Sequence, residues 1–311
     1  MRMSTWSSSA VKTPLHKQSA LHAIHAHKSV FLEWPLGNGL QQAIELAHAA
    51  KGNGIRTMIG LQARQDLAIL KAKQLLDQHT IGKVLSSTFI GYGGAWGPAV
   101  QQRNAYTLDE KNGTTLLTVP FGHFIDAFVY LLGDFESLSA YKTTVIPTST
   151  VIETNEQVDV KTAPDQLTVQ GQLLSGALAA VHYRGGNPLP GSQGPVWEIE
   201  GEKGLITFKA SGTGHIQASS TTIKPASDQT DFLISPILST APQQLISPQL
   251  YLSGEQVDLP QDKLGNTGRL YEAFAKCDQS GYNDWDHAVQ NHRIVDAVER
   301  SCKEGRRTSY L

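Results

Sequence analysis

The sequence predicts a chain that begins as an α/β fold and continues as an α+β fold. Short apolar runs alternate with amphipathic runs of helical length over roughly the first 80 residues, as in parallel sheets with helical crossovers. Beyond residue 133, β-like segments follow one another at hairpin-like turns. The 311 residues contain no internal repeat and are enough for two domains.

The first expected domain covers residues 1–80 and contains three strands, each followed by a helix. The expected strands are 7–13, 29–34 and 55–61. The expected helices are 14–28, 38–52 and 64–79. Pro14 suits a first helical turn, and Asn38 is a favourable N-cap. This order indicates a partial Rossmann-type parallel sheet.

The second expected domain, residues 81–311, has a large and mostly antiparallel open sheet. Strand 82–94 runs into the glycine-rich stretch GYGGAWG, and an apolar helix is expected at 114–133. Further β-like segments are 137–146, 165–174, 176–185, 196–210 and 215–223. Residues 225–265, rich in Pro, Ser and Gln, read as a surface excursion. Two helices, 268–278 and 285–305, are expected to pack back on the first domain.

Composition narrows the functional class. The net charge of -2 includes no basic surplus, so direct binding of nucleic acid is not expected. No apolar run approaches the roughly 20 residues that span a bilayer, and the start of the chain lacks the apolar region of a secretory signal. Cys277 and Cys302 are too few for a disulfide framework. A cytoplasmic protein is therefore expected.

The histidines of the first helix do not indicate a metal site. His16, His22, His25 and His27 crowd that helix, and His22 and His25 have a spacing that could share a metal ion. No matching Cys, Asp or Glu set lies nearby in the sequence, so a solvated helix face is favoured and no metal is expected.

The second expected strand ends in Glu33 and Trp34, and Pro35 follows directly. The carboxyl ends of strands line the ligand crevice of an open α/β sheet. A glutamate there can cap a helix, orient a ligand or pair with a cation, whereas an indole can stack, fill space or donate one N–H bond. This corner is a candidate ligand site.

His123 is the second candidate, because it interrupts an apolar stretch three residues before Asp126. An imidazole can exchange a proton near neutral pH, and a hydrogen-bonded core histidine fits the residues equally well. The glycine clusters 91–97 and 185–191 do not open helices, so loop geometry is favoured over phosphate binding.

Several stretches, in this order, resemble the Gfo/Idh/MocA family of oxidoreductases. They are TPLH (13–16), FLEWPLG (31–37), IGKV (81–84), GHFIDAFVYLLG (122–133) and VWEIEGEKGLITF (196–208). Within the family, the chain is most similar to the branch that contains the galactose-regulon repressor of budding yeasts. The stretches LEWPL, GYGGAWG, VPFGHFIDAF and YRGGNP carry this similarity.

The resemblance implies a set of site residues. NAD or NADP would lie against Thr13, Pro14, His16, Glu33, Trp34 and Pro35. The substrate pocket would include Gln62, Arg64, Tyr92, Trp96, Thr118 and Asp126. His123 would be the catalytic proton donor or acceptor.

The chain departs from the family pattern in three ways. Trp34 stands where the family has its catalytic lysine, and an indole cannot move a proton. The aspartate of the family's Asp-x-x-x-His pattern falls near Thr118, with one extra residue before His123. The chain also begins near the family's fourth strand, without a Gly-x-Gly-x-x-Gly turn. This weighs against cofactor binding and favours an incomplete gene product.

Three functions remain open. The first is an oxidoreductase-like protein that acts with NAD(P) on a small hydroxyl or carbonyl metabolite, for example in fungal secondary metabolism. The second is a non-enzymatic dinucleotide sensor or transcription co-regulator with a protein partner, which would also act in the nucleus. The third is an inactive fragment. A homodimer through the sheet of the second domain is expected by resemblance.

Overall fold

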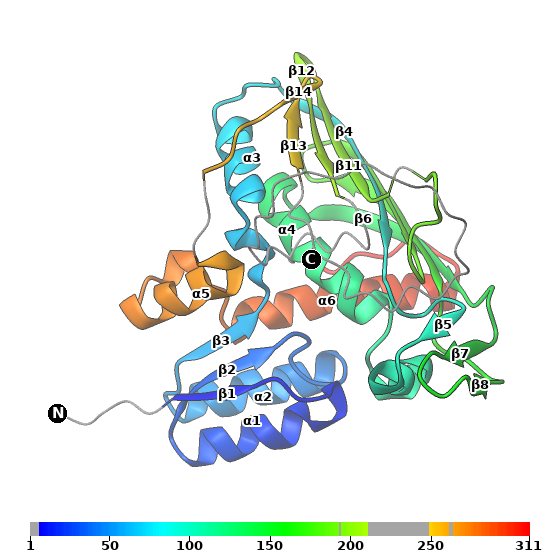
Figure 1. The fold of residues 1–311 in the computed structure, drawn as a ribbon. Coiled ribbons are helices and arrows are strands. Elements are labelled where there is room, and N and C mark those ends of the chain that lie inside the picture. Colours follow the sequence, from blue (N-terminus) through cyan, green and yellow to red (C-terminus); the bar gives the residue numbers. More distant parts are fainter. Residues whose placement is uncertain (1–5, 193, 211–248, 261–263) are drawn as a thin grey trace, which may run out of the picture.

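The computed structural model describes residues 6–192, 194–210, 249–260 and 264–311. It has a mixed α/β architecture with a small parallel sheet and a large, mostly antiparallel sheet, which confirms the predicted fold class (Figure 1). The predicted strand at 215–223 lies outside the described residues.

The parallel sheet has the order β1-β2-β3, formed by β1 (Trp6–Ser9), β2 (Ser29–Glu33) and β3 (Thr57–Gly60). Helices α1 (His16–His25) and α2 (Leu40–Gly52) cover one face, where Val30 and Leu32 join the main core. Phe31 and Met58 point to the other face and pack against α5 (Gly265–Lys276), opposite α1 and α2 (Figure 1). Both faces are thus buried, as parallel sheets require.

Two elements of this portion are shorter than predicted. The first strand ends at Ser9, and a 3₁₀ turn at Thr13–Leu15 precedes α1. The helix expected to reach residue 28 ends at His25, because His27 adopts a left-handed backbone with φ 51°. That conformation cannot continue a right-handed helix.

The large sheet has the order β14-β13-β12-β11-β4-β10-β9-β6. Its strands are β4 (Val84–Tyr92), β6 (Phe135–Thr143), β9 (Gln166–Leu173), β10 (Leu178–Arg184), β11 (Val196–Gly201), β12 (Gly204–Lys209), β13 (Gln249–Leu252) and β14 (Glu255–Gln256). Only β4 and β10 pair in parallel. A small sheet of β5 (Ala99–Val100), β7 (Ser149–Val151) and β8 (Gln157–Val158) lies beside it (Figure 1).

The prediction of a surface excursion over 225–265 is wrong where the structure describes it. Residues 249–256 form β13 and β14, and β13 pairs with β12 with Leu250 opposite Phe208. Leu250 is fully buried. Two short strands joined by a tight turn at Ser253 and Gly254 carry too little periodicity to stand out among polar neighbours.

The predicted apolar helix 114–133 contains a change of helix type. Leu117–Phe121 form a π-helix, and α4 (Gly122–Leu132) continues from it. Pro120 has no N–H to offer the Leu116 carbonyl, which accepts the Phe121 N–H at 3.1 Å instead. The proline therefore explains the wider turn.

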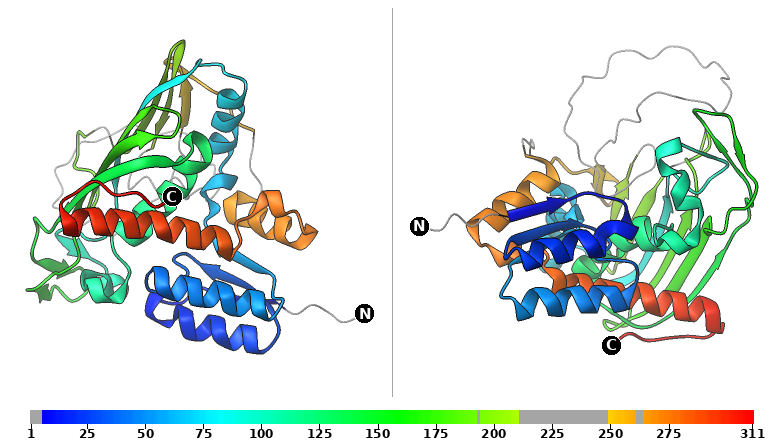
Figure 2. Two further views of the ribbon diagram at one scale, coloured as in Figure 1. Left: turned by 180° about the vertical axis from the view of Figure 1, so that it is seen from behind. Right: turned by 90° about the horizontal axis from the view of Figure 1, so that it is seen from below.

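Helix α6 (Trp285–Glu304) runs between the two sheets (Figures 1 and 2). Its N-cap, Asp284, accepts the His287 N–H. The Trp285 indole donates to Met58 O of β3 at 3.3 Å, and the Ser301 hydroxyl accepts Ala140 N of β6 at 2.9 Å. The remaining helix, α3 (Leu67–Asp77), follows a 3₁₀ turn at Gln62–Gln65.

Segment 110–132 is long and apolar enough to cross a membrane by length and composition. However, 72% of its most apolar window is buried inside the protein. Its α4 part supplies Phe124, Ile125 and Phe128 to the core, and a core helix needs the same composition as a membrane span.

Candidate functional site

The candidate site lies at the carboxyl end of β2, around Trp34. The Trp34 side chain is 4% exposed, and its peptide bond to Pro35 is cis. Its indole N–H donates to the Thr118 carbonyl oxygen at 2.6 Å. On its ring face the His292 imidazole of α6 lies with ring centroids 4.4 Å apart. The indole therefore joins the parallel sheet to the start of α4 and to α6.

The segment before His123 is a π-helix, Leu117–Phe121, which continues into α4. Thr118 lies in this π-helix, and His123 is the second residue of α4. The Thr118 hydroxyl is held by Gly113 O at 2.7 Å, and its carbonyl by Trp34. Trp34 and the π-helix are therefore in direct contact.

Gly122 is required for this contact. A Cβ built on Gly122 would lie 2.5 Å from Trp34 Nε1 and 2.9 Å from Cε2. Separations below 3 Å force a rigid indole to move. The Gly122 carbonyl in turn accepts Asn291 Nδ2 at 2.8 Å. Glycine at this position allows α4 to approach the end of β2.

His123 and His292 are the buried imidazoles of the site. His123 lies in the first turn of α4, next to Gly122. Burial lowers the pKa of His292 to about 3, so it is neutral near pH 7. Its Nε2 is buried and has no hydrogen-bond partner in the part of the chain that the structure describes. A neutral ring packed on Trp34 adds no charge to this part of the site.

Glu33 is the last residue of β2, next to Trp34 in the chain. It forms no hydrogen bond or ion pair with the described parts of the chain, and burial raises its pKa to about 7. Its carboxyl lies over Gly60 of β3, where a Cβ would overlap Oε2. Two residues further along the chain, Gln62 Oε1 is buried and has no hydrogen-bond partner among the described residues. Glu33 and Gln62 thus place two acceptors without a partner near the ends of neighbouring strands.

The polar groups expected to bind a cofactor on α1 are already used within the protein. His16 Nδ1 and Nε2 lie 2.7 Å from Pro35 O and 2.8 Å from Val11 O. The Thr13 hydroxyl accepts the Thr114 hydroxyl at 2.9 Å. Pro14 is exposed. These residues shape the corner around Pro35, and Glu33 is the residue whose side chain is left for a ligand.

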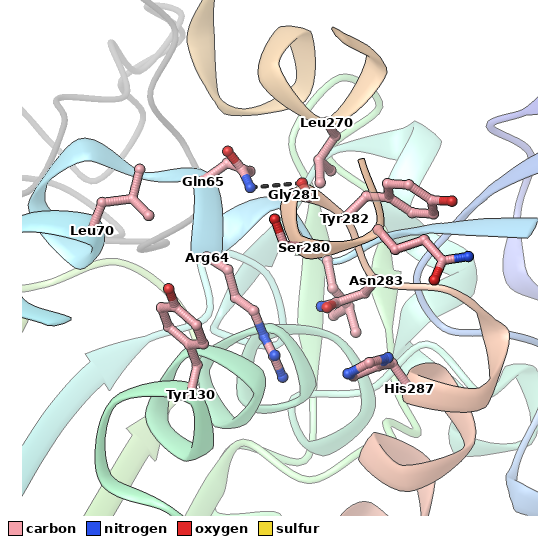
Figure 3. Close-up of a pocket in the computed structure, with 12 residues that line it drawn as sticks. Arg64, Gln65, Leu70, Tyr130, Leu270, Ser280, Gly281, Tyr282, Asn283 and His287 are labelled. Atoms are coloured by element: carbon pink, nitrogen blue, oxygen red, sulfur yellow. Dashed lines mark hydrogen bonds between the residues drawn. The ribbon is translucent and has the colours of Figure 1, made fainter. Parts of the chain in front are cut away.

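The predicted substrate-pocket residues divide into two groups. Arg64 binds the Asp126 carboxylate with Nε–O distances of 3.0 Å, and Asn283 Nδ2 donates to both carboxylate oxygens at 3.2 Å. Arg64 and Asn283 line a cavity of about 290 Å³, together with Tyr130 and His287 (Figure 3). Asp126 is thus committed to this cluster.

Tyr92 and Trp96 belong to the second group, in the glycine-rich loop after β4. Trp96 Nε1 donates to Thr107 O at 3.1 Å and to Thr114 O at 3.3 Å. The Arg184 guanidinium lies 5.9 Å from the centroid of the Tyr92 ring. Trp96 therefore contacts the turn that leads to Thr118, whereas the cavity beside Arg64 is lined by other residues.

Two parts of the arrangement were not predicted from the sequence. His292 lies in an amphipathic helix with no motif to mark it, and only the fold brings it to Trp34. Lys161 and Asp165 form a fully buried ion pair at 2.8 Å in a loop between β8 and β9. A single sequence carries no signal for such long-range contacts.

The histidines of the first helix differ in their exposure. His22, His25 and His27 are exposed on or just after α1, whereas His16 is buried. Among the described residues, no group of three or more His, Cys, Asp or Glu side chains is placed to hold a metal ion.

Comparisons with known proteins identify the family. Residues 68–210 match the family described as the Gal80p C-terminal domain. The chain is 26% identical over 307 residues to dehydrogenase aclE of Aspergillus oryzae, covering 97% of this chain and 77% of the relative. Residues 68–210 are therefore similar to the Gal80-like C-terminal domain of the Gfo/Idh/MocA oxidoreductases.

The chain is also similar to regulatory proteins. The chain is 35% identical over 192 residues to the galactose/lactose metabolism regulatory protein of Saccharomyces cerevisiae, covering 58% of this chain and 44% of that protein. A crystal structure of a super-repressor mutant of Gal80p from this yeast superposes with a TM-score of 0.80 at 26% identity, over 97% of this chain and 79% of that one.

A levoglucosan dehydrogenase, solved with NADH and L-sorbose, shares the fold with a TM-score of 0.71. It is 18% identical, over 99% of this chain and 80% of that one. The chain thus has relatives among dehydrogenases and among regulators of one fold.

Proposed function

We propose that the protein is an oxidoreductase-type protein that binds NAD(P) at the carboxyl end of the parallel sheet and acts on a small hydroxyl or carbonyl metabolite. The half-buried Glu33 carboxyl, which has no hydrogen-bond partner among the described residues, is the observation that supports this most directly. Partial burial disfavours the charged form of a carboxyl, and a donor group beside it offsets that cost. A ligand hydroxyl or amide would supply the missing donor at the strand end, where such folds bind ligands.

The dinucleotide, when bound, supplies or accepts the hydride. The residues of this chain do the rest. Glu33 accepts a donor group of the ligand, with Gln62 Oε1 as a further acceptor. Trp34 forms an apolar wall of the site on the side of Thr118. Its one N–H group is already bonded to the Thr118 carbonyl oxygen and is not available to a ligand. His123 on α4 gives or takes the proton at the metabolite oxygen, a role an imidazole can fill near neutral pH.

The decisive experiment compares wild type with His123→Ala. Purified protein is incubated with NADH or NADPH and a panel of small carbonyl compounds, and cofactor oxidation is followed by absorbance. We expect turnover in wild type and a loss of about 10²–10⁴-fold in His123→Ala. The control His25→Ala removes an exposed imidazole on α1 and should not change the rate. Equal turnover in wild type and His123→Ala, or none in either, would overturn the assignment.

A second function is favoured by Trp34, which provides no proton-transfer group where the family has its lysine. In this case the protein is a dinucleotide sensor of the Gal80 type that binds a protein partner in the cytoplasm or nucleus. Calorimetric titration with NADH separates the two functions. Binding without turnover on any carbonyl compound, unchanged by His123→Ala, supports the sensor, whereas turnover dependent on His123 supports the enzyme.

We also keep the division into two domains near residue 80, and a homodimer through the large sheet, as proposals. Size-exclusion chromatography with light scattering tests the dimer, since a monomer at all concentrations would contradict it.

A further inference from the structure

A buried ion pair lies behind the glycine-rich loop 91–97, outside the residues that the sequence singled out. Lys161 Nζ and Asp165 Oδ2 are 2.8 Å apart, and neither side chain is exposed. Asp165 also accepts the backbone N–H groups of Val145 and Ile146, at 3.0 and 2.8 Å. Buried charges persist only where such bonds satisfy them. This pair therefore holds the loop between β8 and β9 firmly against the backbone of Val145 and Ile146.

The ammonium has a second acceptor, and that acceptor is Trp96. Lys161 Nζ donates to the Trp96 carbonyl oxygen at 2.7 Å. Trp96 has φ 60°, a left-handed conformation that is uncommon for a bulky residue. Gly185 packs directly on the same carbonyl, since a Cβ there would lie 2.5 Å from Trp96 O. The bond from Lys161 thus helps to hold Trp96 in a conformation that it would not adopt alone.

The Trp96 side chain passes this constraint to the turn 113–118. Its indole N–H donates to Thr114 O at 3.3 Å. At the other end of the turn, Thr118 Oγ1 donates to Gly113 O at 2.7 Å, and Thr118 O accepts the Trp34 indole at 2.6 Å. A continuous series of polar contacts therefore runs from Lys161 through Trp96 and the turn to Trp34.

We infer that Lys161 is a positioning residue for the site at the end of β2. Through Trp96 it sets the position of the turn 113–118, and so of the Thr118 carbonyl that orients Trp34 and of His123 on the helix that follows. The inference rests on the proposed function, because it places a ligand beside Trp34. If the pair only stabilised the loop, Trp34 would not sense its removal.

The test follows the indole N–H resonances of the folded protein by ¹⁵N NMR, with Trp34→Phe used to assign the Trp34 signal. Two variants then break the series of contacts. Trp96→Phe keeps an aromatic ring but removes the N–H donor along with part of the indole, and Lys161→Met removes the ammonium while keeping the length of the side chain. In both variants we expect the Trp34 resonance to shift or broaden, and the Kd for NADH to rise about tenfold.

Lys142→Met is the matched control. Lys142 is also largely buried and forms ion pairs with Glu110 and Glu299, both at 2.5 Å. Neither of these pairs involves Trp96. Loss of this lysine should therefore lower the melting temperature, as loss of Lys161 does, but leave the Trp34 resonance and NADH binding at their wild-type values.

The outcomes separate the inference from the proposed function. An unchanged Trp34 resonance in folded Lys161→Met or Trp96→Phe would overturn the inference, whatever happens to binding. If Lys161→Met does not fold, Trp96→Phe decides alone. Absence of NADH binding in wild type would overturn the proposed function, and a shifted Trp34 resonance would then still support the positioning role of Lys161.

Discussion

Glu33 makes the stability of the protein depend on pH. Burial raises its pKa from 4.5 to about 7. Below pH 4.5 the carboxyl is protonated in both the folded and the unfolded chain, so it adds no pH dependence. Between pH 4.5 and 7 the unfolded chain ionises first, and the free energy of unfolding falls as the pH rises. Above pH 7 Glu33 is ionised in both the folded and the unfolded chain, so the loss of stability that it causes stays constant.

Glu33→Gln should remove this slope. An amide of the same size does not titrate, so we expect the variant to be more stable than wild type at pH 8, by on the order of 1–3 kcal/mol, and equal to it near pH 4. Urea denaturation from pH 4 to 8 measures both. Glu255→Gln, at an exposed carboxyl of β14, is the control. Parallel profiles for Glu33→Gln and wild type would contradict the assignment of the slope to Glu33.

His292 acts in the opposite direction. Burial lowers its pKa from 6.5 to about 3, so the unfolded chain takes up a proton that the folded chain does not. Stability from this group is complete above pH 6.5 and is lost as the pH falls toward 3. The two slopes oppose each other between pH 4.5 and 6.5. In Glu33→Gln the opposing slope of Glu33 is absent, so stability should rise more steeply with pH between 4.5 and 6.5 than it does in wild type.

Gly122→Ala tests how closely α4 approaches Trp34. The new Cβ would lie 2.5 Å from Trp34 Nε1 in a packed interior, so the indole must move and lose its bond to Thr118 O. We expect a loss of about 1–3 kcal/mol in the free energy of unfolding, measured in urea. Gly52→Ala, at a helical glycine with open space around it, should be neutral or slightly stabilising. Equal stability of the two variants would contradict the packing argument.

At the scale of elements, local patterns predicted most of the fold. The alternation of strands and helices fixed the parallel sheet, and apolar periodicity located the core part of α4. The glycine at 122, the proline at 120 and the extra residue before His123 were all visible in the sequence. Their joint result, a π-helix that accepts the Trp34 indole, depends on a contact between remote segments and could not be predicted from either one.

The candidate site was predictable to the same extent. Glu33 and Trp34 stood out because they lie at the end of an expected strand. His292, Lys161 and the committed partners of Asp126 depend on which helix or loop packs against which strand. Of the predicted pocket, Arg64 and Asp126 therefore form their own cluster beside the cavity of Figure 3, while Trp96 and Thr118 lie toward Trp34.

Asp126 ties α4 to two other elements. It is 2% exposed and accepts hydrogen bonds from Arg64, after β3, and from Asn283, before α6. Asp126→Asn leaves the guanidinium without its charge partner, so we expect a loss of about 2–4 kcal/mol in the free energy of unfolding. Asp77→Asn breaks the exposed i,i+4 pair with Lys73 and should cost less than about 0.5 kcal/mol. Similar costs in urea denaturation would show that the Asp126 cluster is not structural.

At the scale of the whole molecule, α6 is the element shared by both sheets. Trp285 donates to Met58 of the parallel sheet, Asn291 to Gly122 of α4, and Ser301 accepts from Ala140 of the large sheet. Helix α6 is therefore bonded to the parallel sheet, to α4 and to the large sheet. Neither sheet can lose α6 without exposing part of the main core, in which residues of both sheets form one cluster.

We therefore expect the two sheets to unfold in a single transition, even if they are separate domains. The indole N–H signals of Trp6 in β1 and Trp197 in β11 report on the two sheets separately. Followed by NMR through a urea titration, both should disappear at one urea concentration, together with the far-UV circular dichroism. Ser301→Ala removes the contact of α6 with β6 and should move both midpoints down by the same amount. Loss of the Trp197 signal ahead of Trp6 in that variant would show that α6 does not couple the sheets.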